Sequence, residues 1–219
     1  MYTSNPGSFT LKYIRHGEKK EVTIKRGIHK GKKTIGYNNL ETTRNRPLWY
    51  SLSNQLKPSH IVLIKFTQAR HFEIFSEKPI LADHTSDLLY LKNIKTSKSN
   101  VAIQFYLTVW LFLNSTLFYL IKELFGMRMG GGVLQVLTGF FEDMPVPNLS
   151  SLEIDFDAER LFKRKPLPYK EEINQSDRKE LDKAVLRALG FAESELDRLV
   201  GELHKAFVEV VEDRLIKAG

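Results

Sequence analysis

The feature that most constrains the fold is a nearly continuous apolar run at residues 101–121, VAIQFYLTVWLFLNSTLFYLI. A run of this length is long enough to cross a membrane as one helix. Drawn at 100° per residue, however, its polar positions and the adjoining lysine fall in one narrow sector: Gln104, Thr108, Ser115, Tyr119 and Lys122. We therefore expect a central buried helix, or two short helices that meet near Asn114 and Ser115, with a membrane span as the alternative.

The first hundred residues are expected to form strands and turns, because short apolar-polar alternations there are separated by glycine and polar residues. Two hairpins and two edge strands are predicted: residues 8–14 with 21–27, residues 60–66 with 71–75, and then residues 78–80 and 88–93. Gly17 lies where the first hairpin would turn, and Pro79 is tolerated best at a sheet edge.

The C-terminal part is expected to be helical. Residues 176–190 offer Ser176 or Asp177 as an N-cap and end at Gly190, and residues 191–219 place apolar side chains at helical spacing. Together they predict a helical hairpin after the proline-rich stretch at residues 145–170. The expected fold is α+β: a sheet-rich N-terminal half around a long central buried helix, followed by the helical hairpin. The expected domains are residues 1–150 and residues 151–219, the latter comprising the linker and the helical extension.

Positive charge is concentrated near the N-terminus. Residues 1–100 hold 18 lysines and arginines against 7 acidic residues, while the rest of the chain is slightly acidic. Such an imbalance predicts contact with a polyanion, with a merely solubilising surface as the alternative. The chain contains no cysteine, which excludes disulfides and thiolate chemistry. The N-terminal sequence does not resemble a signal peptide, so we expect a cytoplasmic protein.

Several common chemistries lack their sequence signatures. The glycines at 130–132 are not followed by a Walker-type Gly-Lys-Ser/Thr, and neither GxGxxG nor GxSxG occurs. The histidines form no close metal-binding pair, although His60 and His71 flank one predicted hairpin. No catalytic residue and no metal ligand is predicted. The alternative function is a metal-dependent nuclease that uses carboxylates such as Glu73 or Asp83.

An ordered series of motifs carries a resemblance to a known family. LNST at 113–116, KELFG at 122–126, GGG at 130–132 and DMPVPN at 143–148 follow one another. This series resembles the C-terminal target-recognition region, the TaqI-like specificity domain, of adenine-specific DNA methyltransferases from type II and fused restriction-modification enzymes. Residues 46–52, RPLWYSL, and residues 182–191, DKAVLRALGF, look like further parts of that region.

The resemblance implies a sequence-specific binder of double-stranded DNA, with residues 1–150 as its DNA target-recognition domain, and it assigns the methyl transfer to another part of the enzyme. The family's Asn/Asp-Pro-Pro-aromatic motif is absent, since the chain contains no Pro-Pro pair. No cofactor is therefore expected in this chain, and S-adenosylmethionine is expected in the missing catalytic domain. The implied partners are DNA and a methyltransferase catalytic domain or subunit, without a membrane. A protein-docking subunit built on the helical hairpin is a third possibility.

The candidate DNA-binding residues are basic or aromatic. Arg44, Arg46 and Arg70 are expected to read base edges, since arginine pairs with guanine in the major groove, and lysines such as Lys32 are expected to bind phosphates. Trp49 has a competing role as a structural anchor, and the glycines at 130–132 are expected to pack while Arg128 reaches a phosphate. The full set is Lys12, Lys30, Lys32, Lys33, Arg44, Arg46, Trp49, Tyr50, Arg70 and Arg128.

Overall fold

The computed structural model describes residues 7–50, 57–90 and 100–217. The chain divides into two compact parts, Met1–Lys57, here called unit 1, and Pro58–Gly219, called unit 2. The division expected after residue 150 falls inside unit 2, because the C-terminal helices pack on the central ones. Each unit is described by itself.

Unit 1 begins with a helix where the sequence suggested a strand. Its elements are α1 (Ser8–Lys19), β1 (Glu21–Thr23), β2 (Lys33–Ile35) and the 3₁₀ helix η1 (Tyr37–Asn39). The strand predicted at residues 8–14 is wrong: β1 pairs antiparallel with β2, with Glu21 opposite Ile35. The strand predicted at residues 21–27 is real but ends at Thr23.

An aromatic cluster surrounds Trp49 in unit 1. The Trp49 ring lies 5.7 Å from Tyr13, 5.6 Å from Tyr37 and 5.7 Å from Tyr50, measured between ring centroids. Gly17 of α1 faces the same indole, and a Cβ atom at this position would lie 2.4 Å from its Cη2. The close contact explains why the helix carries a glycine here, and it makes Trp49 a structural anchor of unit 1.

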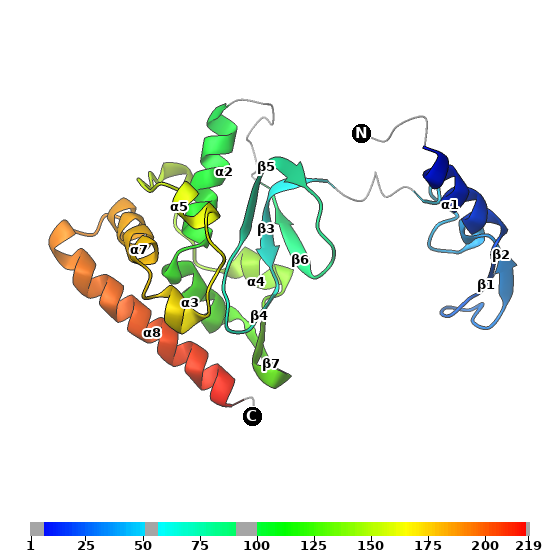
Figure 1. Ribbon diagram of the computed structural model, residues 1–219. Helices are drawn as coiled ribbons and strands as arrows, with labels where there is room; N and C mark the ends of the chain where they lie inside the picture. The colour runs from blue at the N-terminus through cyan, green and yellow to red at the C-terminus, as the bar shows by residue number, and fades with distance from the viewer. Residues whose placement is uncertain (1–6, 51–56, 91–99, 218–219) are drawn as a thin grey trace. The chain divides into compact units, whose positions relative to one another are not determined.

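Unit 2 contains two three-stranded antiparallel sheets with helices packed on them (Figure 1). The strand orders are β5-β3-β6 and β4-β8-β7. The strands are β3 (Ser59–Ile64), β4 (Phe66–Thr67), β5 (Ile74–Ile80), β6 (Ser86–Leu89), β7 (Met127–Met129) and β8 (Val133–Gln135). The α-helices are α2 (Asn100–Leu113), α3 (Thr116–Phe125), α4 (Thr138–Asp143), α5 (Glu159–Phe162), α6 (Tyr169–Glu172), α7 (Ser176–Ala188) and α8 (Leu196–Ile216). Short 3₁₀ turns are η2 (Gly130–Gly132), η3 (Leu149–Ser151) and η4 (Glu193–Glu195).

The pairing of the second predicted hairpin is confirmed, since β3 pairs antiparallel with β5 and places Ile61 opposite Phe75. Its predicted bounds are not: Phe66 lies in β4, which pairs with β8, and residues 71–73 precede β5. Residues 78–80 continue β5 instead of forming a strand of their own. Because β5 lies at the sheet edge, Pro79 removes no hydrogen bond that a central strand would need. The strand predicted at 88–93 begins earlier, as β6, and its residues 91–93 lie outside the described part of the chain.

The apolar run forms two helices, which is one of the two arrangements expected from the sequence. α2 and α3 meet at Asn114 and Ser115 with a bend of 63°. Ser115 is fully buried, and its hydroxyl caps α3 by accepting a hydrogen bond from the Phe118 N–H. No single helix of the described residues is long and apolar enough to cross a membrane, although the bent pair passes that test jointly by length and composition.

The helical hairpin is confirmed as α7 and α8, with α8 packed on both α7 and α3 (Figure 1). Gly190 follows α7 with a φ of 94°, a left-handed conformation that favours glycine. The N-cap of α7 is Gln175, without a side-chain cap, so neither Ser176 nor Asp177 takes that place. With helices and antiparallel sheets in one chain, the expected α+β class is confirmed.

Candidate nucleic-acid interface

The net positive charge of the chain belongs to unit 1. Residues 1–57 contain 12 lysines and arginines and 3 glutamates, while residues 58–219 contain 21 basic and 23 acidic residues. Of the basic side chains at 7–50, Lys33 is the only lysine or arginine with an ion pair among the described residues, 2.8 Å from Glu21. The remaining positive charge of this stretch is therefore not neutralised locally.

The loop between β1 and β2 presents four basic residues to solvent. Lys25, Arg26, Lys30 and Lys32 are all exposed there. Backbone hydrogen bonds from Gly31 N to Ile24 O (2.8 Å) and from Ile24 N to Lys32 O (2.9 Å) close the loop. Gly27 and Gly31 have φ values of 82° and 87°, so the chain reverses at positions that require glycine.

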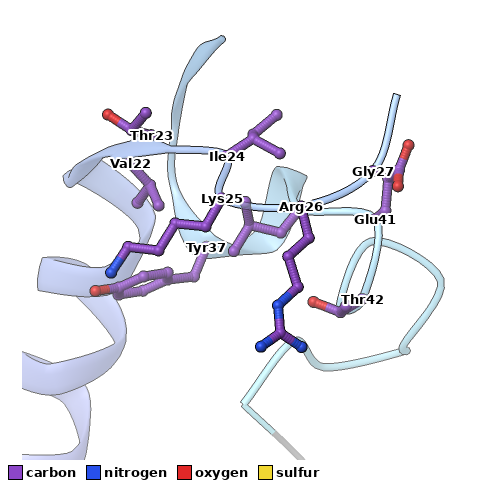
Figure 2. Close-up of a pocket in the computed structure, with 10 residues that line it drawn as sticks. Val22, Thr23, Ile24, Lys25, Arg26, Gly27, Tyr37, Glu41 and Thr42 are labelled. Carbon is purple, nitrogen blue, oxygen red and sulfur yellow. The ribbon is translucent and has the colours of Figure 1, made fainter. Parts of the chain in front are cut away.

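A pocket of about 480 Å³ opens beside this loop. Figure 2 shows the Lys25 side chain alongside Tyr37, Arg26 extending toward Thr42, and the Glu41 carboxylate near Gly27. The pocket thus combines an aromatic ring and aliphatic walls with charged groups. It is lined by Val22, Thr23, Ile24, Lys25, Arg26, Gly27, Tyr37, Leu40, Glu41 and Thr42.

Eight of the ten predicted site residues lie in unit 1. Lys12 is exposed on α1, with its Nζ 5.6 Å from the centroid of the Phe9 ring. Arg44 is exposed in the segment after η1, whereas Arg46 is half-buried and its Nε finds no hydrogen-bond partner among the described residues. The others are Lys30, Lys32 and Lys33 of the hairpin and the clustered Trp49 and Tyr50.

The other two predicted residues, Arg70 and Arg128, lie in unit 2. Arg70 is exposed between β4 and β5. Arg128 in β7 forms an ion pair of 2.6 Å with Asp213 of α8, and both side chains are 42% exposed. Phosphate binding by Arg128 would therefore compete with this ion pair.

The three glycines form the turn between β7 and β8. Gly131 and Gly132 both have a φ of 69°. Gln68 Nε2 donates to the Gly131 carbonyl at 2.9 Å, and Arg214 Nη1 donates to the Gly132 carbonyl. The turn is thus fastened to the rest of unit 2, which agrees with a packing role for these glycines.

The carboxylates considered for a nuclease have other partners. Glu73 is buried and accepts hydrogen bonds from Ile64 N (2.6 Å) and Lys122 Nζ (2.5 Å), and burial raises the pKa of Glu73 above its ordinary value. Asp83 is exposed and accepts a hydrogen bond from Thr85 N at 3.0 Å. Within the described ranges, no three His, Asp or Glu side chains gather as metal ligands would.

His60 and His71 are each held separately. His60 Nδ1 lies 2.8 Å from the Ser76 carbonyl, and His71 Nε2 lies 2.8 Å from Glu123 Oε1. His71 is buried, and desolvation lowers its pKa, which favours the neutral imidazole as a donor to Glu123. His71 thus joins the segment between β4 and β5 to α3 inside unit 2.

Lys25 and Arg26 are the site residues that the sequence interpretation missed. Residues 21–27 were expected to form one strand, in which neighbouring side chains point to opposite faces. The strand instead ends at Thr23, and the following turn brings both cations to the same pocket. Gly27, directly after the two basic residues, was the available signal, because glycine marks turns.

The chain has no match among protein-family models, curated proteins or solved structures.

Proposed function

We propose that this chain recognises duplex DNA as the target-recognition part of an adenine-specific DNA methyltransferase from a restriction-modification system. The observation that carries the proposal is the charge of unit 1, where basic residues outnumber acidic ones four to one and are mostly without ion-pair partners. Duplex DNA presents about one negative charge per 1.7 Å of its axis, and unpaired surface cations bind it by releasing its counterions.

Different basic residues serve different purposes in this proposal. Lysines of the β1–β2 hairpin, such as Lys32, bind phosphates and set the salt dependence of binding. Arg44 and Arg46 are in the same unit and read base edges, with Arg70 of unit 2 as a third reader. Trp49 acts indirectly, because its ring contacts hold the segment that carries the two arginines.

The chemistry is assigned to a partner. The chain lacks the Pro-Pro motif with which amino-methyltransferases of the resembled family hold their target base. The proposed partner is a methyltransferase catalytic domain or subunit that binds S-adenosylmethionine, and this chain supplies the choice of DNA sequence.

The test is selection of bound DNA from a random duplex library at two salt concentrations, with and without Mg²⁺. We expect salt-sensitive binding, an enriched short motif and no cleavage. Absence of duplex binding at low salt would contradict the proposal, and Mg²⁺-dependent cutting would favour the nuclease.

Single substitutions then separate reading from phosphate binding. Arg44→Ala is expected to relax the selected motif at one base pair, whereas Lys32→Ala is expected to weaken all duplexes equally and to reduce the salt slope by about one. Lys205→Ala removes the same charge from an exposed position of α8, so it serves as the matched control. Equal losses on every sequence for Arg44, Arg46 and Arg70 variants would remove their assignment as readers.

A further inference from the structure

We propose that the pocket beside the β1–β2 loop binds a single unpaired nucleotide of DNA, with its base against Tyr37 and its phosphates on Lys25 and Arg26. The inference rests on the proposed DNA binding of unit 1 and assigns a specific ligand to one part of it. It predicts that the chain prefers DNA with an extrahelical base over a fully paired duplex.

The size and the walls of the pocket suit a nucleobase. Its volume of about 480 Å³ lies within the usual range for small-molecule sites. Val22, Ile24 and Leu40 supply aliphatic surface, and Tyr37 supplies a ring. A base inside a duplex is covered by its stacked neighbours, so only an unpaired base can enter such a pocket.

Tyr37 is held in position before any ligand arrives. Its ring centroid lies 5.6 Å from that of Trp49, and its carbonyl accepts a hydrogen bond from the Thr43 hydroxyl. A fixed ring loses little conformational entropy when a base stacks on it. Stacking of bases on aromatic side chains is also tolerant of base identity, so no single base is required.

Charge determines how the nucleotide is oriented. Lys25 and Arg26 form no ion pair among the described residues, and Figure 2 shows them extending toward different parts of the pocket, past Tyr37 and toward Thr42. Two separated cations can contact the phosphates on either side of one nucleotide. Glu41 lies at the rim near Gly27, and its carboxylate would repel a phosphate there. The backbone is therefore expected on the Lys25 and Arg26 side.

The test compares three DNAs of identical duplex sequence by fluorescence anisotropy with the full chain. The first is fully paired, the second carries one bulged nucleotide, and the third carries an abasic bulge with the same backbone and no base. We expect the bulged DNA to bind about tenfold more tightly than the abasic one, as the stacking of one base on an aromatic ring implies.

Two variants locate the effect. Thr42→Phe fills the pocket from its wall and is expected to remove the preference for the bulged base, while Thr10→Phe introduces the same ring at an exposed position of α1 outside the pocket and should leave it intact. Arg26→Ala is expected to weaken the bulged DNA more than the paired duplex.

The outcomes separate the two proposals. Duplex binding with equal affinity for the bulged and abasic DNAs, or a preference that survives Thr42→Phe, would overturn the nucleotide pocket and leave the proposed function standing. Binding to none of the three DNAs would overturn both.

Discussion

Arg214 in α8 donates two hydrogen bonds to the buried carboxylate of Glu123 in α3, from Nε at 2.9 Å and from Nη2 at 2.8 Å. The same guanidinium donates to the carbonyls of Gln68 and Gly132. One side chain thus joins the last helix, the central helix, the glycine turn and the segment after β4. Although burial alone would raise the pKa of Glu123, hydrogen bonds from His71 and Arg214 hold it below its ordinary value.

Replacing Arg214 with methionine is expected to destabilise the protein by about 3–5 kcal/mol, because the substitution leaves the Glu123 charge buried without its main partner. Urea unfolding followed by circular dichroism measures the loss. Arg128→Met is the matched control, since it removes an exposed arginine-carboxylate pair and should destabilise the protein far less. Similar losses in the two variants would show that the Arg214 network contributes no more than a surface pair.

The glycine turn offers a test within two adjacent positions. Gly131→Ala is expected to cost about 1 kcal/mol, because its φ of 69° disfavours any residue with a Cβ. Gly130→Ala is the control, since an added Cβ would meet nothing within 4 Å and the position has no positive φ. It is expected to be neutral or slightly stabilising through the unfolded chain. The shifts in thermal unfolding midpoint caused by the two substitutions should therefore differ in sign or in size. Equal midpoints would contradict the turn geometry.

Gly17→Ala is expected to disrupt unit 1, because the new Cβ would lie 2.4 Å from the Trp49 ring. Overpacking of this kind typically costs about 1–3 kcal/mol. The indole N–H resonance of Trp49 in an NMR spectrum should shift or broaden, while that of Trp110 in unit 2 serves as an internal reference. Gly7→Ala, at a position without neighbours within 4 Å, should leave both resonances in place. An unchanged Trp49 resonance in Gly17→Ala would contradict the packing described for unit 1.

Glu172 is expected to make the stability of unit 2 sensitive to acid. It accepts hydrogen bonds from Arg164 and Arg178, which lower its pKa from 4.5 to about 2 although burial alone would raise it. A carboxylate with a depressed pKa in the folded state stabilises the protein above its unfolded-state pKa. That stabilisation is lost as pH falls from about 4.5 toward 2.

Glu172→Gln should therefore lower the free energy of unfolding by about 2 kcal/mol at neutral pH. The difference in stability from the unsubstituted protein should shrink below pH 4.5. Urea midpoints measured from pH 7 to pH 3 check this. Glu180→Gln, which removes an exposed partner of Arg160, serves as the control and should show a much smaller effect at every pH. A difference for Glu172→Gln that stays constant with pH would contradict the assigned pKa.

The sequence alone was sufficient to predict an element where the local periodicity of that element agrees with its long-range packing. The apolar run at 101–121 contains Asn114 and Ser115, whose short polar side chains favour a helix boundary, and the structure ends α2 and begins α3 there. The β3–β5 hairpin and the α7–α8 pair were predicted for the same reason. The charge excess near the N-terminus was also visible in the sequence, but only the structure showed that residues 1–57 form a compact unit that carries it.

Local periodicity was misleading at residues 8–14. Phe9, Leu11 and Tyr13 alternate as in a strand, yet all three are exposed on α1, and the buried positions are Ile14 and Gly17, which are three residues apart. The buried face of the helix is the one that packs against Trp49, which lies 32 residues beyond Gly17 in the chain. The alternating positions thus lie mostly on the exposed side of the helix, although the Tyr13 ring also reaches Trp49, at 5.7 Å between ring centroids.

The sequence by itself determined the elements whose hydrophobic period matches the surface they bury, together with the overall sign of the charge. Tertiary structure decided which charges remain exposed and which are buried in pairs, because Glu123 and Arg214 meet across 91 positions and Lys122 meets Glu73 across 49. It also decided the pocket, since the walls come from two chain segments, 22–27 and 37–42, that only the β1–β2 hairpin brings together. Contacts between residues far apart in sequence leave no periodic signal in either segment.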